Sequence, residues 1–147
     1  MERIVVTVSD EGMEALGALA RGISLARRIG ARLYVLSLER PGSRAAGASS
    51  RLFSVGDEVA ERMQMLIEGA RADGVSVDIH ISEGSYEEAL VRFCREYRVT
   101  LWIVGIPDKH RRDHHEALMR IHKIRARLGC AVEIVHPKRT MGPTEED

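Results

Sequence analysis

The chain has 147 residues, of which 44% are apolar and 30% charged, a balance typical of one soluble globular domain. Lys and Arg total 22, as do Asp and Glu, so the formal net charge is zero. A neutral chain has little attraction for nucleic-acid phosphates, so we expect no nucleic-acid partner. Its apolar runs are too short to span a bilayer and its first residues do not resemble a signal peptide, so we expect a cytoplasmic protein without membrane insertion.

Apolar strand-like runs alternate with helix-like segments through the first half of the chain. Two glycines follow apparent helix ends: Gly30 comes after Arg27 and Arg28, and Gly74 follows Asp73. Between the two helices lies a long stretch rich in Gly, Ser, Ala and Arg, a composition typical of loops. The pattern predicts strands at 3–8 and 32–38, helices at 11–29 and 57–72, and a mobile loop at 39–56.

The second half continues the alternation. Residues 75–82 alternate apolar and polar side chains, which predicts an edge strand whose wet face carries His80. Ser85 and Glu88 form a capping box that opens a helix. Further strands are predicted at 100–104 and 130–136, separated by a last helix with core residues Ala117, Leu118, Ile121, Ile124 and Leu128.

This order predicts an α/β fold, a single doubly wound five-stranded parallel sheet with helices on both faces. Strands 1, 2 and 4 read as buried on both faces and strands 3 and 5 as edges, which favours the order 3-2-1-4-5. We expect one domain over residues 1–139 and a frayed tail at 140–147. In such sheets ligands bind beyond the carboxyl ends of the strands where the order reverses, here between strands 1 and 4.

Two cysteines, Cys94 and Cys130, have no C-x-x-C spacing. In a reducing compartment the expected state is two buried thiols, and a disulfide or redox pair is the alternative.

The candidate ligand site contains the stretch GIPDKHRRDHHEALM, residues 105–119, which follows strand 4. The residues proposed to line it are Ser9, Asp10, Gly105, Lys109, Arg111 and Arg112. His110 and His114 are four apart, but no cysteine is near and Pro107 makes this segment a loop, so we expect solvated histidines and no metal.

A phosphate cradle needs glycines, because backbone N–H groups must approach the anion closely. Here Gly105 stands alone, Pro107 has no N–H and Asp108 repels an anion, so only the Lys109, Arg111 and Arg112 side chains remain as anion ligands. No G-x-S-x-G elbow is present and Ser85 is explained as a helix cap, so we predict no catalytic residue.

The chain resembles universal stress proteins over nearly all of residues 3–138. The similarity rests on the element order and on four stretches: IVVTV in the first strand, EGSYEEAL at 83–90, TLWIVG at 100–105 and GCAVEIVHPKR at 129–139. The nucleotide-binding branch of that family carries a phosphate signature after strand 4, namely Gly, two residues, Gly, nine residues, Gly, then Ser or Thr. From Gly105 the later positions fall on Asp108, Leu118 and Met119, so three of the four are lost.

The resemblance therefore implies a regulatory or adaptor protein of the stress response, acting as a homodimer with an unidentified regulatory partner and without a cofactor such as ATP. In many family members the last strand pairs with its twin, which here implies a dimer edge at Val132, Glu133, Ile134 and Val135. The alternative is a sensor that binds a nucleotide or other small anion at the strand 1/strand 4 switch point. A weak ATP hydrolase is the third possibility.

Overall fold

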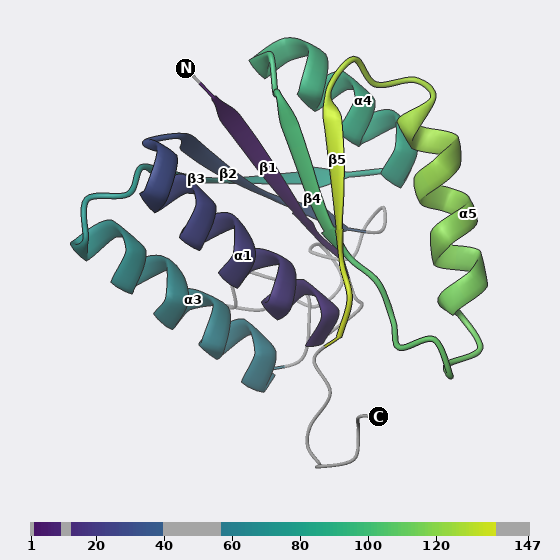
Figure 1. Ribbon diagram of the computed structural model, residues 1–147, viewed down its shortest axis with the longest axis horizontal. Coiled ribbons are helices and arrows are strands. Elements are labelled where there is room, and N and C mark those ends of the chain that lie inside the picture. The colour runs from purple at the N-terminus through teal and green to yellow at the C-terminus, as the bar shows by residue number, and fades with distance from the viewer. Residues whose placement is uncertain (1, 10–12, 40–56, 138–147) are drawn as a thin grey trace.

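The computed structural model describes residues 2–9, 13–39 and 57–137, which form one parallel sheet between two layers of helices (Figure 1). The strand order, β3-β2-β1-β4-β5, confirms the predicted topology. The strands are β1 (Arg3–Val8), β2 (Arg32–Glu39), β3 (Val77–Glu83), β4 (Leu101–Gly105) and β5 (Ala131–Val135). The helices are α1 (Met13–Ile29), α3 (Asp57–Ala72), α4 (Tyr86–Tyr97) and α5 (His114–Arg125).

Each face of the sheet has its own apolar core. Ile4 and Val6 of β1 join the core beneath α1 and α3, whereas Val5 joins the core beneath α4 and α5. All three are completely buried, as is Trp102 of β4. Full burial of one such aliphatic side chain contributes about 1.5–3 kcal/mol. The prediction that the central strands are buried on both faces is therefore confirmed.

The local signals at helix ends behave as expected. Gly30 follows α1 with a φ of 71°, a left-handed conformation that favours glycine. Its N–H donates a hydrogen bond to the Ala26 carbonyl. Ser85 caps α4, because its hydroxyl accepts a hydrogen bond from the Glu88 N–H at 3.4 Å. The Glu88 carboxylate contacts Arg127, which follows α5, at 2.9 Å, so the two helices are also joined by charge.

The prediction that His80 lies on a wet strand face is wrong. Its half-buried ring lies 5.8 Å from Tyr34, 5.1 Å from Phe93 and 5.0 Å from Tyr97, measured between ring centroids. The exposed residues of β3 are instead Ile81, at 42%, and Glu83. Residue alternation correctly separated the apolar side chains of this strand from the polar ones. However, Phe93 and Tyr97 of α4 pack over His80 on the polar face.

Several expectations concern residues outside the described ranges. These are Asp10, nearly all of the predicted loop at 39–56, and the predicted tail at 140–147. Glu39 is described, and it is the last residue of β2 rather than the first of the loop. Among the helices that the structure describes, none combines the length and the apolar character that a bilayer crossing requires.

Two helical glycines give a matched test of how tightly α1 is packed on the sheet. A Cβ added at Gly22 would lie 2.7 Å from Cγ2 of Val6, whereas one added at Gly69 in α3 would meet nothing within 4 Å. We expect Gly69→Ala to stabilise the protein by about 0.5–1 kcal/mol, the helix propensity gain, and Gly22→Ala to destabilise it by about 1–3 kcal/mol. Urea denaturation measures both, and equal effects would show that α1 can move off β1.

Candidate functional site

The candidate site lies where β1 and β4 run side by side and their chains leave the sheet in opposite directions. The two strands pair in parallel, with Val6 opposite Ile103, so their carboxyl ends meet at one edge. The first turn of α1 and the segment 106–113 flank this switch point. Of the candidate ligand residues, Lys109, Arg111 and Arg112 lie in that segment, Gly105 is the last residue of β4, and Ser9 directly follows β1.

Gly105, the one glycine of the phosphate signature that remains, makes a close contact with α1. An added Cβ at this position would lie 2.9 Å from the carbonyl carbon of Glu14 and closer still to its oxygen. The space next to Gly105 is therefore filled by protein backbone. This glycine is required by helix packing whether or not an anion binds.

Asp108 organises the loop that follows. Its carboxylate accepts a hydrogen bond from the His110 N–H at 2.9 Å, and its carbonyl accepts one from the Arg111 N–H at 2.9 Å. This arrangement is a turn stabilised by its own Asp side chain. Upstream, the Ile106 N–H donates to the Val135 carbonyl at 3.2 Å, which extends the β4–β5 pairing. The loop is thus held by internal hydrogen bonds.

The three basic residues of the loop have different surroundings. Arg111 lies 3.2 Å from the Asp113 carboxylate and 3.8 Å from that of Glu14, whose side chain is only 7% exposed. Lys109 and Arg112 are exposed. Glu14 was missed as a site residue, although an acidic residue in the first turn of the first helix was a visible signal.

Of the other two signature positions, only Leu118 takes part in the core. Leu118 packs against the core beneath α4 and α5, while Met119 is 55% exposed. Of the nearby histidines, His110 and His115 are exposed as expected. His114 is half-buried, and its Nδ1–H donates to the Pro107 carbonyl at 2.9 Å, so the expectation of a solvated side chain is wrong there. Within the described ranges, no cluster of three or more His, Cys, Asp or Glu could hold a metal ion.

The predicted dimer edge, Val132–Val135, lies on the open side of β5. The Ala131 N–H donates to Thr100, and the Val135 carbonyl accepts from Ile106, so odd-numbered residues bond inward to β4. Alternation then directs the N–H and C=O groups of Val132 and Ile134 to the open edge. Arg21 of α1 holds the strand from one face through a two-point ion pair with Glu133, at 2.6 and 3.3 Å.

This architecture is that of a known protein family. Residues 1–120 match the model of the universal stress protein family. The chain belongs to that family. No curated protein sequence matches it.

Solved structures of other universal stress proteins share the fold. One, in complex with cAMP, is 20% identical, with a TM-score of 0.66 and coverage of 93% of this chain and 98% of that one. Another, from Archaeoglobus fulgidus in complex with dAMP, is 18% identical, with a TM-score of 0.58 and coverage of 92% and 98%. UspA from Lactobacillus plantarum is 14% identical, with a TM-score of 0.58 and coverage of 91% and 97%.

This universal stress protein also has a buried hydroxyl cluster near the switch point that the sequence did not reveal. The Thr7 hydroxyl accepts hydrogen bonds from the Tyr86 hydroxyl at 2.9 Å and from the Trp102 indole N–H at 3.0 Å. Arg120 of α5 lies over the Tyr86 ring, 4.6 Å from its centroid. These contacts join β1, β4, α4 and α5 and give the Thr7 hydroxyl and the Trp102 N–H hydrogen-bond partners.

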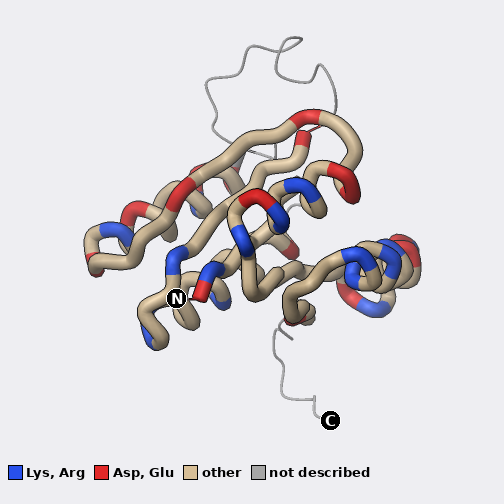
Figure 2. Tube along the Cα trace, turned by 90° about the horizontal axis from the view of Figure 1, so that it is seen from above, with Lys and Arg blue, Asp and Glu red and all other residues tan. Residues whose placement is uncertain are grey.

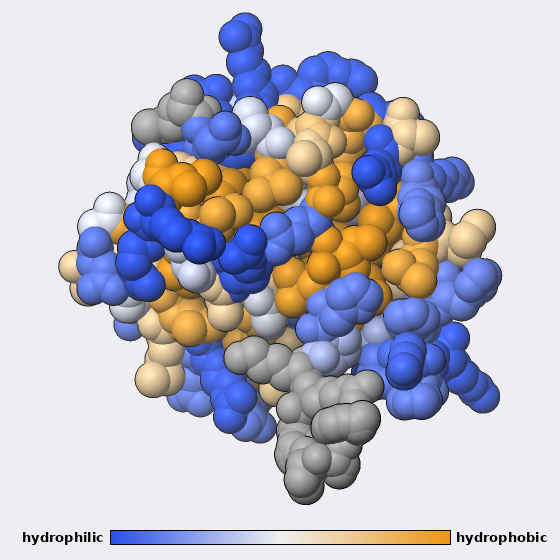
Figure 3. Space-filling model, viewed as in Figure 1, coloured by the Kyte–Doolittle hydropathy of each residue, from blue (hydrophilic) through white to orange (hydrophobic). Residues whose placement is uncertain are grey.

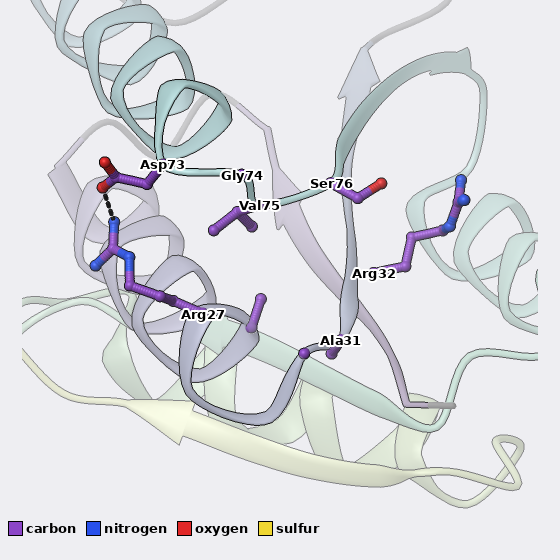
Figure 4. Close-up of a pocket in the computed structure, with 9 residues that line it drawn as sticks. Arg27, Ala31, Arg32, Asp73, Gly74, Val75 and Ser76 are labelled. Atoms are coloured by element: carbon purple, nitrogen blue, oxygen red, sulfur yellow. Dashed lines mark hydrogen bonds and ion pairs between the residues drawn. The ribbon is translucent and has the colours of Figure 1, made fainter.

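A small cavity of about 190 Å³ lies at the opposite edge of the sheet, near the amino ends of β2 and β3 (Figure 4). Arg27 at its rim is paired with Asp73 at 2.9 Å. Arg32 points away from the cavity and pairs with Asp78 at 2.9 Å. Because both cations are already paired, we assign no ligand to this cavity.

The packing role of Gly105 can be tested directly. Gly105→Ala should destabilise the universal stress protein by about 2 kcal/mol or more, because the new methyl group must displace the Glu14 backbone. Gly129→Ala is the matched control, since its added Cβ meets nothing within 4 Å, and we expect a change below about 0.5 kcal/mol. Urea denaturation under reducing conditions compares them. A Gly105→Ala protein as stable as the wild type would refute the packing explanation.

Proposed function

We propose that this universal stress protein is a cytoplasmic regulatory or adaptor protein that does not bind ATP and acts as a homodimer. The observation that carries the first part of the proposal is the use of the phosphate-signature positions. Gly105 receives the backbone of Glu14, Asp108 stabilises its own turn, and Leu118 packs into the core.

The backbone donors of the loop support this view. A phosphate cradle works through N–H groups that point at the anion. Here the N–H groups of Ile106, His110 and Arg111 donate to protein acceptors, and Pro107 has none. The Asp108 carboxylate lies in the same turn and repels an anion. Triphosphate binding would require this loop to exchange several of its own hydrogen bonds.

A nucleotide or anion sensor is the rival function, and two observations favour it. Lys109 and Arg112 are exposed cations beside the switch point. Two universal stress proteins of similar fold are known in complex with cAMP and with dAMP. A weak ATP hydrolase would need nucleotide binding first, so one binding experiment tests both rivals.

Homodimerisation is supported by the open edge of β5 and by the surface beside it. In Figure 1 no described helix lies in front of β5, and Figure 3 shows an apolar area on the same face. Val135 of β5, Leu101 of β4 and Leu25 of α1 are half-buried and pack against the core on the α1 side of the sheet. A second copy pairing through β5 would satisfy the outward N–H and C=O groups and cover part of this area. The resulting dimer would present a composite surface to a regulatory partner.

We expect neither Mg-ATP, cAMP nor dAMP to raise the melting temperature by as much as about 1 °C at millimolar concentration. A ligand present at 100 times its dissociation constant would stabilise the folded state by about 2.7 kcal/mol, a shift of several degrees. Differential scanning fluorimetry followed by calorimetric titration makes the measurement.

The matched variants for this test are Lys109→Ala and Arg112→Ala. If a nucleotide binds and either variant abolishes binding, the sensor function replaces our proposal. Phosphate release from ATP that is lost in Lys109→Ala would favour the hydrolase. Inorganic phosphate alone, titrated in parallel, separates recognition of the nucleotide from recognition of any anion.

For the dimer, we expect Ile134→Asp to weaken self-association about 100-fold, because burying an unpaired carboxylate at an interface costs on the order of 3 kcal/mol. Ile81→Asp is the control: it places the same substitution on β3, the edge strand at the other side of the sheet. Sedimentation velocity over a concentration series measures the dissociation constants.

Ile134 also packs against the core, so a second variant guards against misfolding. Val132→Pro removes the outward N–H of an edge position, where proline is tolerated, and leaves the β4 hydrogen bonds in place. A wild-type protein that sediments as a monomer would contradict the homodimer. A dimer unchanged by both β5 variants would contradict the β5 interface.

A further inference from the structure

Cys94 and Cys130 are far apart in sequence, yet their thiols meet in the fold. Both are free, both pack in the same apolar core, and their thiols lie close enough for each to act on the pKa of the other. Cys94 lies in the last turn of α4, and Cys130 is the residue immediately before β5. Both belong to the apolar core between the sheet and the α4–α5 layer. The sequence had favoured two separate buried thiols.

The backbone holds both cysteines against the same short segment. The Cys94 carbonyl accepts hydrogen bonds from the N–H groups of Arg98 and Val99, the latter at 3.0 Å. The Thr100 carbonyl accepts from the N–H of Ala131, next to Cys130, at 3.1 Å. The segment that ends α4 and begins β4 therefore binds Cys94 directly and binds the residue next to Cys130. The pairing of β5 with β4 thus brings Cys130 to the end of α4.

The two thiols are chemically different. Cys94 is only 7% exposed, whereas Cys130 is half-buried. The hydrogen bond with Cys94 lowers the pKa of the Cys130 thiol, because it stabilises the thiolate. The same hydrogen bond and burial raise the pKa of Cys94. Cys130 is accordingly the more accessible and more easily ionised sulfur, and Cys94 is a thiol held beside it.

We propose that Cys94 and Cys130 form a redox site that a hydroperoxide converts to an intramolecular disulfide, with Cys130 as the nucleophile and Cys94 as the resolving thiol. A peroxide-reactive thiol next to a resolving cysteine is the arrangement that reversible thiol oxidation requires. Within the described residues neither cysteine belongs to a group of three or more possible metal ligands.

The reaction balances in two steps. The Cys130 thiol ionises, and its thiolate attacks the terminal oxygen of the hydroperoxide, so that an S–O bond forms and the O–O bond breaks. The alkoxide or hydroxide that leaves takes up the proton released by Cys130, which gives a sulfenic acid and an alcohol or water. The Cys94 sulfur then attacks the Cys130 sulfur, the S–O bond breaks, and the departing hydroxide takes the Cys94 proton to form water. Two thiols are oxidised by two electrons and the peroxide is reduced by two.

The disulfide would tie the end of α4 to the start of β5. It would close a loop that contains β4 and α5, and closing a loop of this length restricts the unfolded chain. We therefore expect the oxidised protein to melt about 10 °C higher than the reduced protein, provided that the bond forms without strain. A thiol reductant should return the melting temperature to its starting value.

The deciding experiment is mass spectrometry of the intact full chain after treatment with one equivalent of hydrogen peroxide. After acid quenching and alkylation in denaturant, the reduced protein should carry two alkyl groups. The oxidised protein should carry none and should have lost two hydrogens. Proteolysis without reductant should then yield one cross-linked pair of peptides containing Cys94 and Cys130.

Two variants separate the roles of the sulfurs. Cys94→Ser should stop at the Cys130 sulfenic acid, which dimedone traps as a single adduct. Cys130→Ser should give no intramolecular disulfide, and its peroxide consumption should fall at least about 10-fold, because the remaining thiol is buried. Circular dichroism confirms that each variant is folded, and the wild-type mass experiment stands without them.

The proposal is overturned if peroxide-treated wild-type protein keeps two alkylatable thiols, or if its disulfides join different chains only. Over-oxidation of Cys130 with Cys94 left alkylatable would also overturn it, because the resolving step would then be absent. If Cys130→Ser consumes peroxide as fast as the wild type, Cys130 is not the nucleophile.

Discussion

The close approach of α1 to the sheet determines how the rest of this molecule is arranged. At the first turn of the helix the Glu14 carbonyl lies against Gly105, and further along Gly22 lies against Val6 of β1. Two positions without a Cβ thus set the height of α1 above β1 and β4. At that height Glu14 reaches Arg111 in the loop after β4, and Arg21 reaches Glu133 on β5. One packing distance therefore fixes the switch point and the last strand together.

Local charge pairing explains why the switch point offers little free positive charge. At the switch point Arg111 faces both Glu14 and Asp113. Away from it, Arg127, which follows α5, pairs with Glu87 and Glu88 at the start of α4. The pairing lowers the pKa of Glu88. Figure 2 shows basic and acidic residues interleaved along the helices, in keeping with the zero net charge. An anion at the switch point would contact Lys109 and Arg112, but nearby carboxylates would repel it. Long-range electrostatic attraction of the anion to this site would therefore be weak.

The sequence predicted the fold well, because burial and turn signals are local. Fully apolar strands marked the centre of the sheet, and Gly30 and Ser85 marked helix ends that the structure confirms. It predicted the candidate site less well, because a site depends on what lies across space. The glycine at position 105 indicates that a side chain is not tolerated there. Only the fold shows that the backbone of Glu14 occupies the space that a side chain would need. Alternation placed His80 on one strand face, but only the α4 contacts show that aromatic rings cover it. The contact between Cys94 and Cys130 depends on β5 pairing with β4, which no spacing rule encodes.

β5 is the element where these constraints meet. It pairs with β4 alone among the described strands. Side-chain contacts must therefore provide the stabilisation that hydrogen bonds to a second neighbouring strand would give. Arg21 binds it from the α1 face through Glu133, while Val132 and Ile134 pack on the α4–α5 face. At its start, Cys130 touches Cys94 in the turn that ends α4. The proposed dimer edge therefore lies at the open side of β5, and the proposed redox site includes the residue that directly precedes this strand. A covalent bond at the start of β5 would limit how far the strand can shift relative to β4, and it would do so without any change in the groups that face a second copy. If both proposals hold, oxidation would alter the rigidity of the interface while leaving its composition intact, and this change is a means by which the protein would report peroxide to a partner.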